Sequence, residues 1–151
     1  FTGDGHADVF AANFGFADPN LLYISDGTGG FSSVDASPDT VASTAVAAGD
    51  LNNDGNLDAF VANDGEPNLI YIGDGSGAFT TFQASAATNS SQDVALADFD
   101  LDGNLDAFVT NFAGSNRVYF GDGTGNFPSV VAASADTRSS TGVAVGNLNN
   151  R

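Results

Sequence analysis

The 151-residue sequence contains no cysteine, methionine, tryptophan or lysine, and it has one histidine and three arginines. The absence of cysteine excludes disulfides, thiolate catalysis and zinc–thiolate sites. The shortage of basic residues argues against nucleic acid as a partner, because phosphate binding needs a basic surface. Anionic membrane surfaces are disfavoured for the same reason. No apolar run approaches the roughly 18 residues of a membrane-spanning helix, so no membrane span is predicted.

The scarcity of catalytic residue types also weakens the case for an enzyme. His6, the only histidine, lies inside an acidic loop, and neither a G-x-S-x-G turn nor a Ser/His/Asp set is recognisable. General acid–base catalysis needs a positioned pair of groups with shifted pKa values, whereas most carboxylates of this chain lie in repeated loops. We therefore expect no enzyme activity and no catalytic residues.

What the chain has in abundance is acid, with 19 acidic residues and a formal net charge of −16. Much of it lies in a nine-residue loop: DLNNDGNLD at residues 50–58 returns as DFDLDGNLD at 98–106, 48 residues later. Each copy has oxygen-bearing side chains at positions 1, 3, 5 and 9 and glycine at position 6. Calcium takes about six to eight oxygen ligands and tolerates irregular, carboxylate-rich shells. The repeat therefore predicts Ca²⁺ sites.

Three further landmarks recur with the same period. They are an Asn-led tyrosine strand (20–23, 68–71, 116–119), a D-G-x-G-x-F turn (26–31, 74–79, 122–127) and a small-residue apolar strand (46–49, 94–97, 143–146). Asp-Gly followed by Gly predicts a hairpin turn rather than a metal site. No window shows a helical period, so we expect almost no helix. Four short strands per repeat are typical of a β-propeller blade.

The predicted fold is therefore all-β, with blades of four antiparallel strands at about 1–44, 45–92 and 93–140 and an extra inner strand at 141–147. Residues 1–151 would form one partial, or oligomer-completed, β-propeller. Small side chains in the inner strands suit a crowded central axis. The phenylalanines expected to fill the spaces between blades are Phe10, Phe60, Phe108, Phe31, Phe79 and Phe127.

Three blades do not close a ring, since propellers typically have about four to eight. The sequence starts at the second position of one acidic loop and stops at the fifth position of another, at 147–151. We expect a fragment of a six- or seven-bladed propeller, because chain boundaries rarely bisect a structural loop. The alternative is a six-bladed ring of two chains, in which each C-terminal strand completes the other's first blade. In either case open sheet edges should associate.

The predicted Ca²⁺ ligands follow from the loop positions, giving two complete sites and one partial site. The second loop supplies side-chain oxygens of Asp50, Asn52, Asp54 and Asp58, the last bidentate, and the carbonyl of Asn56; the third supplies Asp98, Asp100, Asp102, Asp106 and the carbonyl of Asn104; the partial first loop retains Thr2, Asp4, Asp8 and the carbonyl of His6. The third loop has four carboxylates and the second has three, so the third loop should bind Ca²⁺ with the higher affinity. Magnesium is the second candidate metal. The alternative to a metal site is that the Asp, Asn and Gly residues only form turns.

The repeating unit resembles the FG-GAP/VCBS repeat, the blade of the integrin α-subunit propeller and of many bacterial surface proteins. The matching motifs are D-x-[ND]-x-D-G-N-L-D, N-L-x-Y and D-G-x-G-x-F, and they cover essentially the whole chain. The resemblance implies Ca²⁺ in the loop between the innermost and second strands, an extracellular or cell-surface location, and protein contact through loops on one face. Those loops would be 13–19, 63–67 and 111–115, which vary between repeats.

The leading interpretation is a calcium-stabilised extracellular binding or adhesion module, part of a larger surface or secreted protein, whose protein or glycan ligand is unknown. One alternative is a lectin, with Tyr23, Tyr71 and Tyr119 as aromatic faces, although their place in a strand favours core packing. The other alternative is a structural component of a cell-surface layer or filament.

Overall fold

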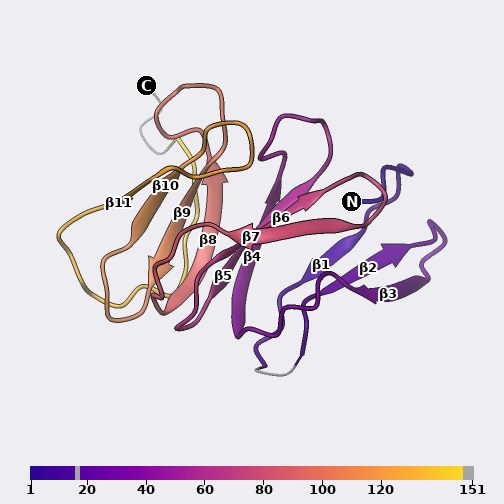
Figure 1. The fold of residues 1–151 in the computed structure, drawn as a ribbon, viewed down its shortest axis with the longest axis horizontal. Helices are drawn as coiled ribbons and strands as arrows, with labels where there is room; N and C mark the ends of the chain where they lie inside the picture. Colours follow the sequence, from indigo (N-terminus) through magenta and orange to yellow (C-terminus); the bar gives the residue numbers. More distant parts are fainter. Residues whose placement is uncertain (16–17, 148–151) are drawn as a thin grey trace.

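The computed structural model describes residues 1–15 and 18–147, which contain no helix and form three antiparallel sheets (Figure 1). The first sheet consists of β1 (Val9–Ala11), β2 (Leu21–Ser25) and β3 (Phe31–Asp35); the second of β4 (Ser43–Gly49), β5 (Asp58–Asn63), β6 (Leu69–Gly73) and β7 (Phe79–Gln83); the third of β8 (Ser91–Ala97), β9 (Asp106–Asn111), β10 (Arg117–Phe120) and β11 (Ser129–Ala132). Strands consecutive in the chain are neighbours in each sheet. The predicted all-β fold of blade-like sheets is confirmed.

The sheets differ from the predicted blades in two details. The boundaries expected at 44/45 and 92/93 fall just inside β4 and β8. The inner strand predicted at 141–147 is not formed, since these residues have no regular secondary structure. β4 and β8 each pair with the strand that follows them, and the described chain has no strand after residue 132 with which this segment could pair. Residues 16–17 of the 13–19 loop and 148–151 of the terminal half-loop lie outside the described residues.

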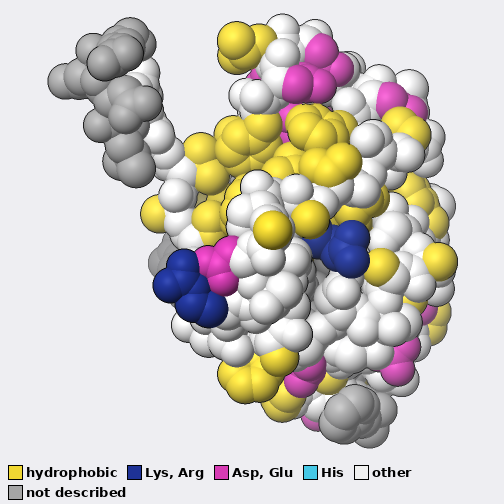
Figure 2. All heavy atoms as spheres, turned by 90° about the vertical axis from the view of Figure 1, so that its left-hand side faces the viewer, with side chains coloured by type: hydrophobic (Ala, Val, Ile, Leu, Met, Phe, Trp, Pro, Cys, Tyr) yellow, Lys and Arg dark blue, Asp and Glu magenta, His cyan; other side chains and the backbone are white. Residues whose placement is uncertain are grey.

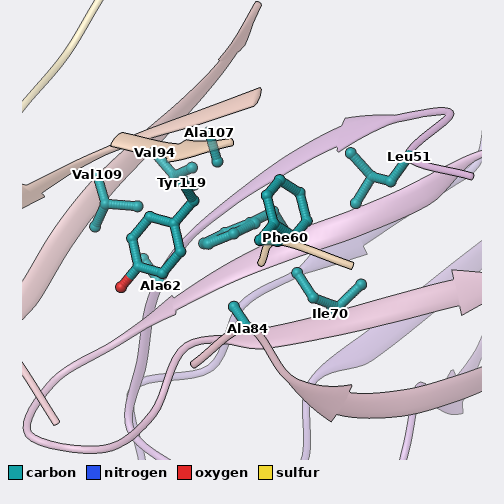
Figure 3. Packing of buried hydrophobic residues seen from close by; sticks show 10 residues of the cluster. Leu51, Phe60, Ala62, Ile70, Ala84, Val94, Ala107, Val109 and Tyr119 are labelled. Carbon is teal, nitrogen blue, oxygen red and sulfur yellow. The ribbon is translucent and has the colours of Figure 1, made fainter. Parts of the chain in front are cut away.

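The spaces between successive sheets are filled by the same aromatic arrangement, used twice. Between the second and third sheets, Phe60 lies edge to face against Tyr119 and Phe127, with ring centroids 5.3 and 5.4 Å apart (Figure 3). Between the first and second sheets, Phe10 contacts Tyr71 and Phe79 at 5.1 and 5.6 Å. Aromatic pairs favour this tilted geometry. Residues that recur in the sequence therefore make the same contacts between each pair of neighbouring sheets.

Two of the six phenylalanines depart from the predicted core role. Phe31 is 56% exposed and Phe108 is only half-buried. Both lie on the outward faces of the first and third sheets, where no described sheet packs against them. The other four, Phe10, Phe60, Phe79 and Phe127, belong to the two apolar clusters between sheets, as predicted.

The inner strands β4 and β8 lie side by side and explain the small residues found there. The hydroxyl of Thr44 on β4 donates a hydrogen bond to the carbonyl of Ser91 on β8 at 2.9 Å. A Cβ atom added to Gly49 would lie 2.7 Å from Cδ1 of Leu105, closer than carbon atoms approach. A larger residue at position 49 would therefore displace the ends of the Leu105 and Leu96 side chains.

Truncating the central aromatic contact should be costly. We expect Phe60→Ala to lower the free energy of unfolding by about 3–5 kcal/mol, because it leaves a cavity between two sheets. Urea unfolding followed by circular dichroism measures this loss. The matched control is Phe112→Ala, whose side chain is 55% exposed and whose removal should change stability by no more than about 0.5 kcal/mol. Equal effects of the two changes would contradict the packing described here.

Candidate metal centre

The two complete acidic loops lie at the same end of neighbouring sheets, between β4 and β5 and between β8 and β9. Their sixth residues, Gly55 and Gly103, have φ values of 89° and 93°, which confirms the predicted role of glycine in the turn. The fourth residues, Asn53 and Leu101, also have positive φ, at 59° and 65°. The sequence does not reveal this second left-handed position, because leucine rarely adopts it.

The third loop gathers three carboxylates. Oxygens of Asp98, Asp100 and Asp106 lie within 4.8 Å of one another. Burial and the negative charges of Asp102, Asp106 and Asp98 raise the pKa of Asp100 above its usual value. Asp102, the remaining predicted side-chain ligand, instead accepts hydrogen bonds from the backbone and side-chain amides of Asn104, at 2.8 and 2.9 Å. The structure thus brings three of the four carboxylates together.

The second loop is organised by the same kind of contacts. Asp50 accepts hydrogen bonds from the backbone N–H groups of Asp54 and Gly55, at 3.1 and 2.9 Å. Asn52 Oδ1 accepts from the N–H of Asp54 at 3.0 Å, and Asp54 Oδ1 accepts from the N–H of Asn56 at 2.7 Å. The bond from the N–H of Asn56, together with a bond from the side-chain amide of Asn52 to Asp54 Oδ2 at 2.9 Å, lowers the pKa of Asp54. The oxygens at positions 1, 3 and 5 all face the backbone of their own loop.

The aspartate at position 9 has a structural role that the sequence analysis missed. Asp58 is completely buried, and its two oxygens accept hydrogen bonds from the N–H groups of Leu51 (2.8 Å) and Gly73 (2.9 Å). Burial raises the pKa of Asp58. Asp106 makes the equivalent bonds with Phe99 and Gly121, at 2.7 and 2.9 Å. Each carboxylate thereby ties the start of its loop to the far end of the tyrosine strand.

These bonds bear on the prediction that Asp58 binds a metal through both oxygens. Each carboxylate oxygen has two lone pairs, so an oxygen that accepts one backbone N–H can still contact a cation. The prediction therefore remains open, and the backbone contacts hold the group in place whether or not a metal is bound. The sequence signal that could have revealed this role is the regular recurrence of an aspartate at the start of one strand and of a glycine or serine at the end of the next.

Comparison with known families identifies the repeating unit. The sequence matches the FG-GAP-like repeat over residues 1–61, 50–109 and 98–150. The chain belongs to the FG-GAP-like repeat family. Two of the matches start at Asp50 and Asp98, the first residues of the acidic loops, so the loop belongs to the family's repeating unit. A search of curated proteins found no match. Within the described residues, no helix is long and apolar enough to cross a membrane.

The partial loop of the first FG-GAP-like repeat is closed by its own contacts. The N–H and hydroxyl groups of Thr2 both donate to Asp8 Oδ2, at 2.9 and 2.8 Å, and Asp8 Oδ1 accepts from the N–H of Ser25. Burial works to raise the pKa of Asp8, but these hydrogen bonds outweigh it and lower the pKa well below its ordinary value. Asp4 accepts from the N–H of His6 at 2.8 Å. Unlike the third loop, this one brings no three described carboxylates together.

Neighbouring FG-GAP-like repeats touch each other at this end of the sheets. Asn53 of the second loop donates a side-chain hydrogen bond to Oδ1 of Asn104 in the third loop, at 3.1 Å. The N–H of Gly125, in the D-G-x-G-x-F turn of the third sheet, donates to the carbonyl of Leu51 at 3.0 Å. A conformational change in the second acidic loop would therefore alter its hydrogen bonds to the third repeat.

The D-G-x-G-x-F elements are hairpin turns, as predicted. They join β2 to β3, β6 to β7 and β10 to β11. In the second, Asp74 Oδ1 accepts hydrogen bonds from the N–H and hydroxyl groups of Ser76, at 2.8 and 2.6 Å, and these bonds lower the pKa of Asp74. Asp26 and Asp122 make the same bonds with the threonine two residues later. These aspartates stabilise turns.

At the opposite end, the loops predicted to bind a ligand begin with asparagines, of which Asn63 and Asn111 are buried and Asn13 is half-buried. Asn63 donates through its backbone to Asn68 Oδ1 (2.9 Å) and through its side chain to the carbonyl of Pro67 (2.6 Å). Asn68 in turn donates to the hydroxyl of Tyr119 on the next sheet at 3.2 Å. The asparagines are therefore part of the framework. Tyr71 and Tyr119 are buried, so their rings are not available to stack on a sugar.

The two roles of the acidic loops can be separated by mutation. We expect Asp58→Asn to lower the free energy of unfolding by about 1–3 kcal/mol even in EDTA, because an amide has one acceptor oxygen and turns its NH₂ group towards a backbone N–H. The control Asp54→Asn alters an exposed position and should cost less than about 0.5 kcal/mol in EDTA. Urea titrations give both values. An Asp58→Asn variant as stable as the parent would rule out the structural role.

Proposed function

We propose that this FG-GAP-like chain is a calcium-stabilised, extracellular binding or adhesion module and part of a larger β-propeller. The observation that carries the proposal is the convergence of Asp98, Asp100 and Asp106 in a loop that recurs in phase with the sheets. FG-GAP-like repeats commonly occur in extracellular or surface proteins, which supports the location. The further blades of the ring would come from the rest of a longer chain or from another copy of this one.

The donor set fits calcium. The third loop provides only oxygen donors, and calcium prefers a flexible shell of carboxylate and carbonyl oxygens, whereas magnesium dehydrates reluctantly. Asp98, Asp100 and Asp106 would hold the ion, with Asp102 and the carbonyl of Asn104 completing the shell after a small rearrangement. The bound cation would remove the repulsion between the carboxylates, which is strong at such short separations.

The proposed effect of calcium reaches beyond the loop because of the buried aspartates. Asp106 is bonded to the N–H of Gly121 beyond β10, so an ion held by Asp106 would also restrain the far end of the tyrosine strand. The second loop would use Asp50, Asn52, Asp54, Asp58 and the carbonyl of Asn56 in the same way. Calcium would thus act as a structural component of each sheet.

Recognition of a partner is proposed for the opposite end of the sheets, and the proposed role is binding rather than catalysis. The loops there vary between repeats on a constant framework, which is where recognition is usually found. Phe14 and Phe112 follow the equivalent framework asparagines, and both side chains are largely exposed. Exposed aromatic side chains of this kind suit contact with a protein. The burial of Tyr71 and Tyr119 gives no support to a lectin.

Calcium should stabilise the chain. At a calcium concentration 100 times the dissociation constant, one site adds about 2.7 kcal/mol to the free energy of unfolding, which corresponds to roughly 5–10 °C in Tm for a chain of this size. Differential scanning fluorimetry in Ca²⁺ and in EDTA measures the shift. Asp100→Asn should reduce it, whereas Asp35→Asn, on an exposed position of β3, should not. A Tm unaffected by Ca²⁺ would refute the proposal.

The affinity for calcium should fall on acidification, because protons compete with the cation for the carboxylates. The pKa of Asp100 is raised by burial and by neighbouring charges, so it becomes protonated at a higher pH than an isolated aspartate, whose pKa is about 3.9. Isothermal titration calorimetry at pH 7, 6, 5 and 4 should show the affinity of the third site falling as the pH is lowered. An affinity that stays constant to pH 4 would be inconsistent with carboxylate ligands.

A further inference from the structure

One arginine of the chain is partly buried and has no acidic partner. Arg117, at the start of β10, is half-buried, with Val109 of β9 and Ala132 of β11 opposite it in the third sheet. Its Nε atom is buried and makes no hydrogen bond with any described residue. The described ion pairs of side-chain cations are those of His6 and Arg138. Arg117 therefore has no ion pair within the described residues, although the chain has 19 acidic residues.

An arginine in such a position is costly. Charged groups removed from water need an opposite charge or a full set of hydrogen bonds. Figure 2 looks onto the side of the molecule that carries the third sheet, and it shows one basic group beside an acidic side chain and another among uncharged and apolar atoms. The ion pair of Arg138 with Asp136 accounts for the first. The folded chain thus retains one cation without a counter-charge among the described residues.

Among the described residues, one other side-chain donor is buried without a partner, namely Nδ2 of Asn89. The backbone carbonyl of Asn89 accepts a hydrogen bond from the N–H of Gly65, in the variable loop that follows β5, at 3.0 Å. The carbonyl of the next residue, Ser90, accepts from the N–H of Phe112, in the variable loop that follows β9, at 2.8 Å. Asn89 therefore lies between the second and third sheets, at the end that carries the variable loops.

The repeat places the two unpartnered donors in the same space. Asn89 and Arg117 occupy the positions of Val41 and Leu69 one repeat earlier. Leu69 belongs to the apolar cluster between the first and second sheets, and Val41 packs against that cluster. The equivalents of the other members are apolar or aromatic and lie in the cluster between the second and third sheets: Leu51, Phe60, Ala84, Val94, Ala107, Val109, Tyr119 and Phe127. Asn89 and Arg117 are thus the two polar replacements in a repeated apolar contact.

These replacements exchange apolar side chains for donors that find no acceptor among the described residues. A buried N–H without a partner costs free energy that valine and leucine at the same positions avoid. Asn89-Ser90-Ser91 also matches the acceptor sequence for N-glycosylation, but the buried Nδ2 atom is inaccessible to modification in the folded chain. What the two donors share is the need for an acceptor, and one of them carries a positive charge.

We propose that the second and third sheets bind a carboxylate group between them, at the end that carries the variable loops, with Arg117 and Asn89 as its donors. The guanidinium presents Nε–H and a terminal N–H side by side, which matches the two oxygens of a carboxylate. The amide of Asn89 donates to one of these oxygens. A single positive charge in a chain of net charge −16 favours a singly charged acid over a phosphate. The site requires neither calcium nor the exposed residues of the variable loops, so it is tested separately from the proposed function.

The Nε–H resonances of arginine report binding directly, because the chain has only three arginines. Titration with sodium acetate in EDTA at pH 6 should shift the Arg117 resonance to saturation and leave that of Arg138 in place. The spectrum of Arg117→Lys, which lacks the first resonance, assigns it. Sodium chloride at the same ionic strength is the control. An Arg117 resonance that moves equally with acetate and chloride, or with neither, would overturn the proposal.

Variants that restore the earlier repeat separate a ligand site from a structural contact. Asn89→Val and Arg117→Leu introduce the side chains found at positions 41 and 69. Each should raise the Tm by a few degrees in the absence of acetate, because an unpartnered donor is removed. Asn89→Val keeps the arginine resonance, and its affinity for acetate should fall several-fold. If both variants are less stable than the parent without acetate, the two side chains serve the packing of the sheets and the proposal is wrong.

Two conservative changes test whether the shape of the guanidinium matters. Arg117→Lys keeps the charge but loses the paired N–H groups, so the rise in Tm that acetate produces in the parent should be lost. The control Arg138→Lys alters a side chain that is 88% exposed and should respond to acetate as the parent does. An Arg117→Lys variant that is stabilised as much as the parent would show that only general charge attraction operates, which contradicts the proposed site.

The source of the carboxylate is tested with the same resonance. N-acetylglutamate amide presents a carboxylate on an amino-acid side chain, as a protein partner would, whereas acetate represents a free small acid. Tighter binding of the glutamate derivative than of acetate indicates that the site receives an acidic side chain of a partner. Equal or weaker binding indicates a free acid. If neither compound shifts the Arg117 resonance, the second and third sheets do not bind a carboxylate.

Discussion

Contact between successive sheets is the interaction on which the rest of this structure depends. A sheet of three or four short strands buries little surface alone, and here each sheet buries an apolar face only where the next sheet covers it. The contact is specific as well as apolar, because Phe60 meets Tyr119 edge to face and the tyrosine hydroxyl accepts a hydrogen bond from Asn68. A buried hydroxyl without such a partner would be costly. The repeat therefore specifies both the distance and the orientation of its neighbour.

The same contact explains why the two ends of the sheets can differ in function. The framework asparagines and the position-9 aspartates bond to the backbone at opposite ends of the strands, and Asn63, Asn111, Asp58 and Asp106 are buried. With the strands held in this way, the exposed residues of the acidic loops at one end and of the variable loops at the other can differ between repeats without disturbing the core. Cation binding is proposed at the first end and partner recognition at the second.

The uncovered outer faces follow from the quasi-one-dimensional character of repeat proteins. Every repeat has one face that receives a neighbour and one that inserts into it, so a row of sheets always has one unfilled face of each kind. Phe31 is the visible consequence, since it has the residue type of a core position and is 56% exposed, whereas Phe108 is half-buried beside residues 143–146.

Several features of the protein were determined by the sequence alone. The period of the acidic loops, the Asp-Gly turns and the absence of a helical pattern were sufficient for an all-β, blade-like fold, and the matching repeats were sufficient for the family, because these signals are local and recur. The structure decided what depends on neighbours distant in the chain. Asp58 looks like a metal ligand in sequence but also bonds to the N–H of Gly73, and Asn63 looks like part of a recognition loop but is buried. Whether Phe31 is core or surface, and whether residues 141–147 form a strand, depends on which sheet lies beside them, and no local pattern contains that information.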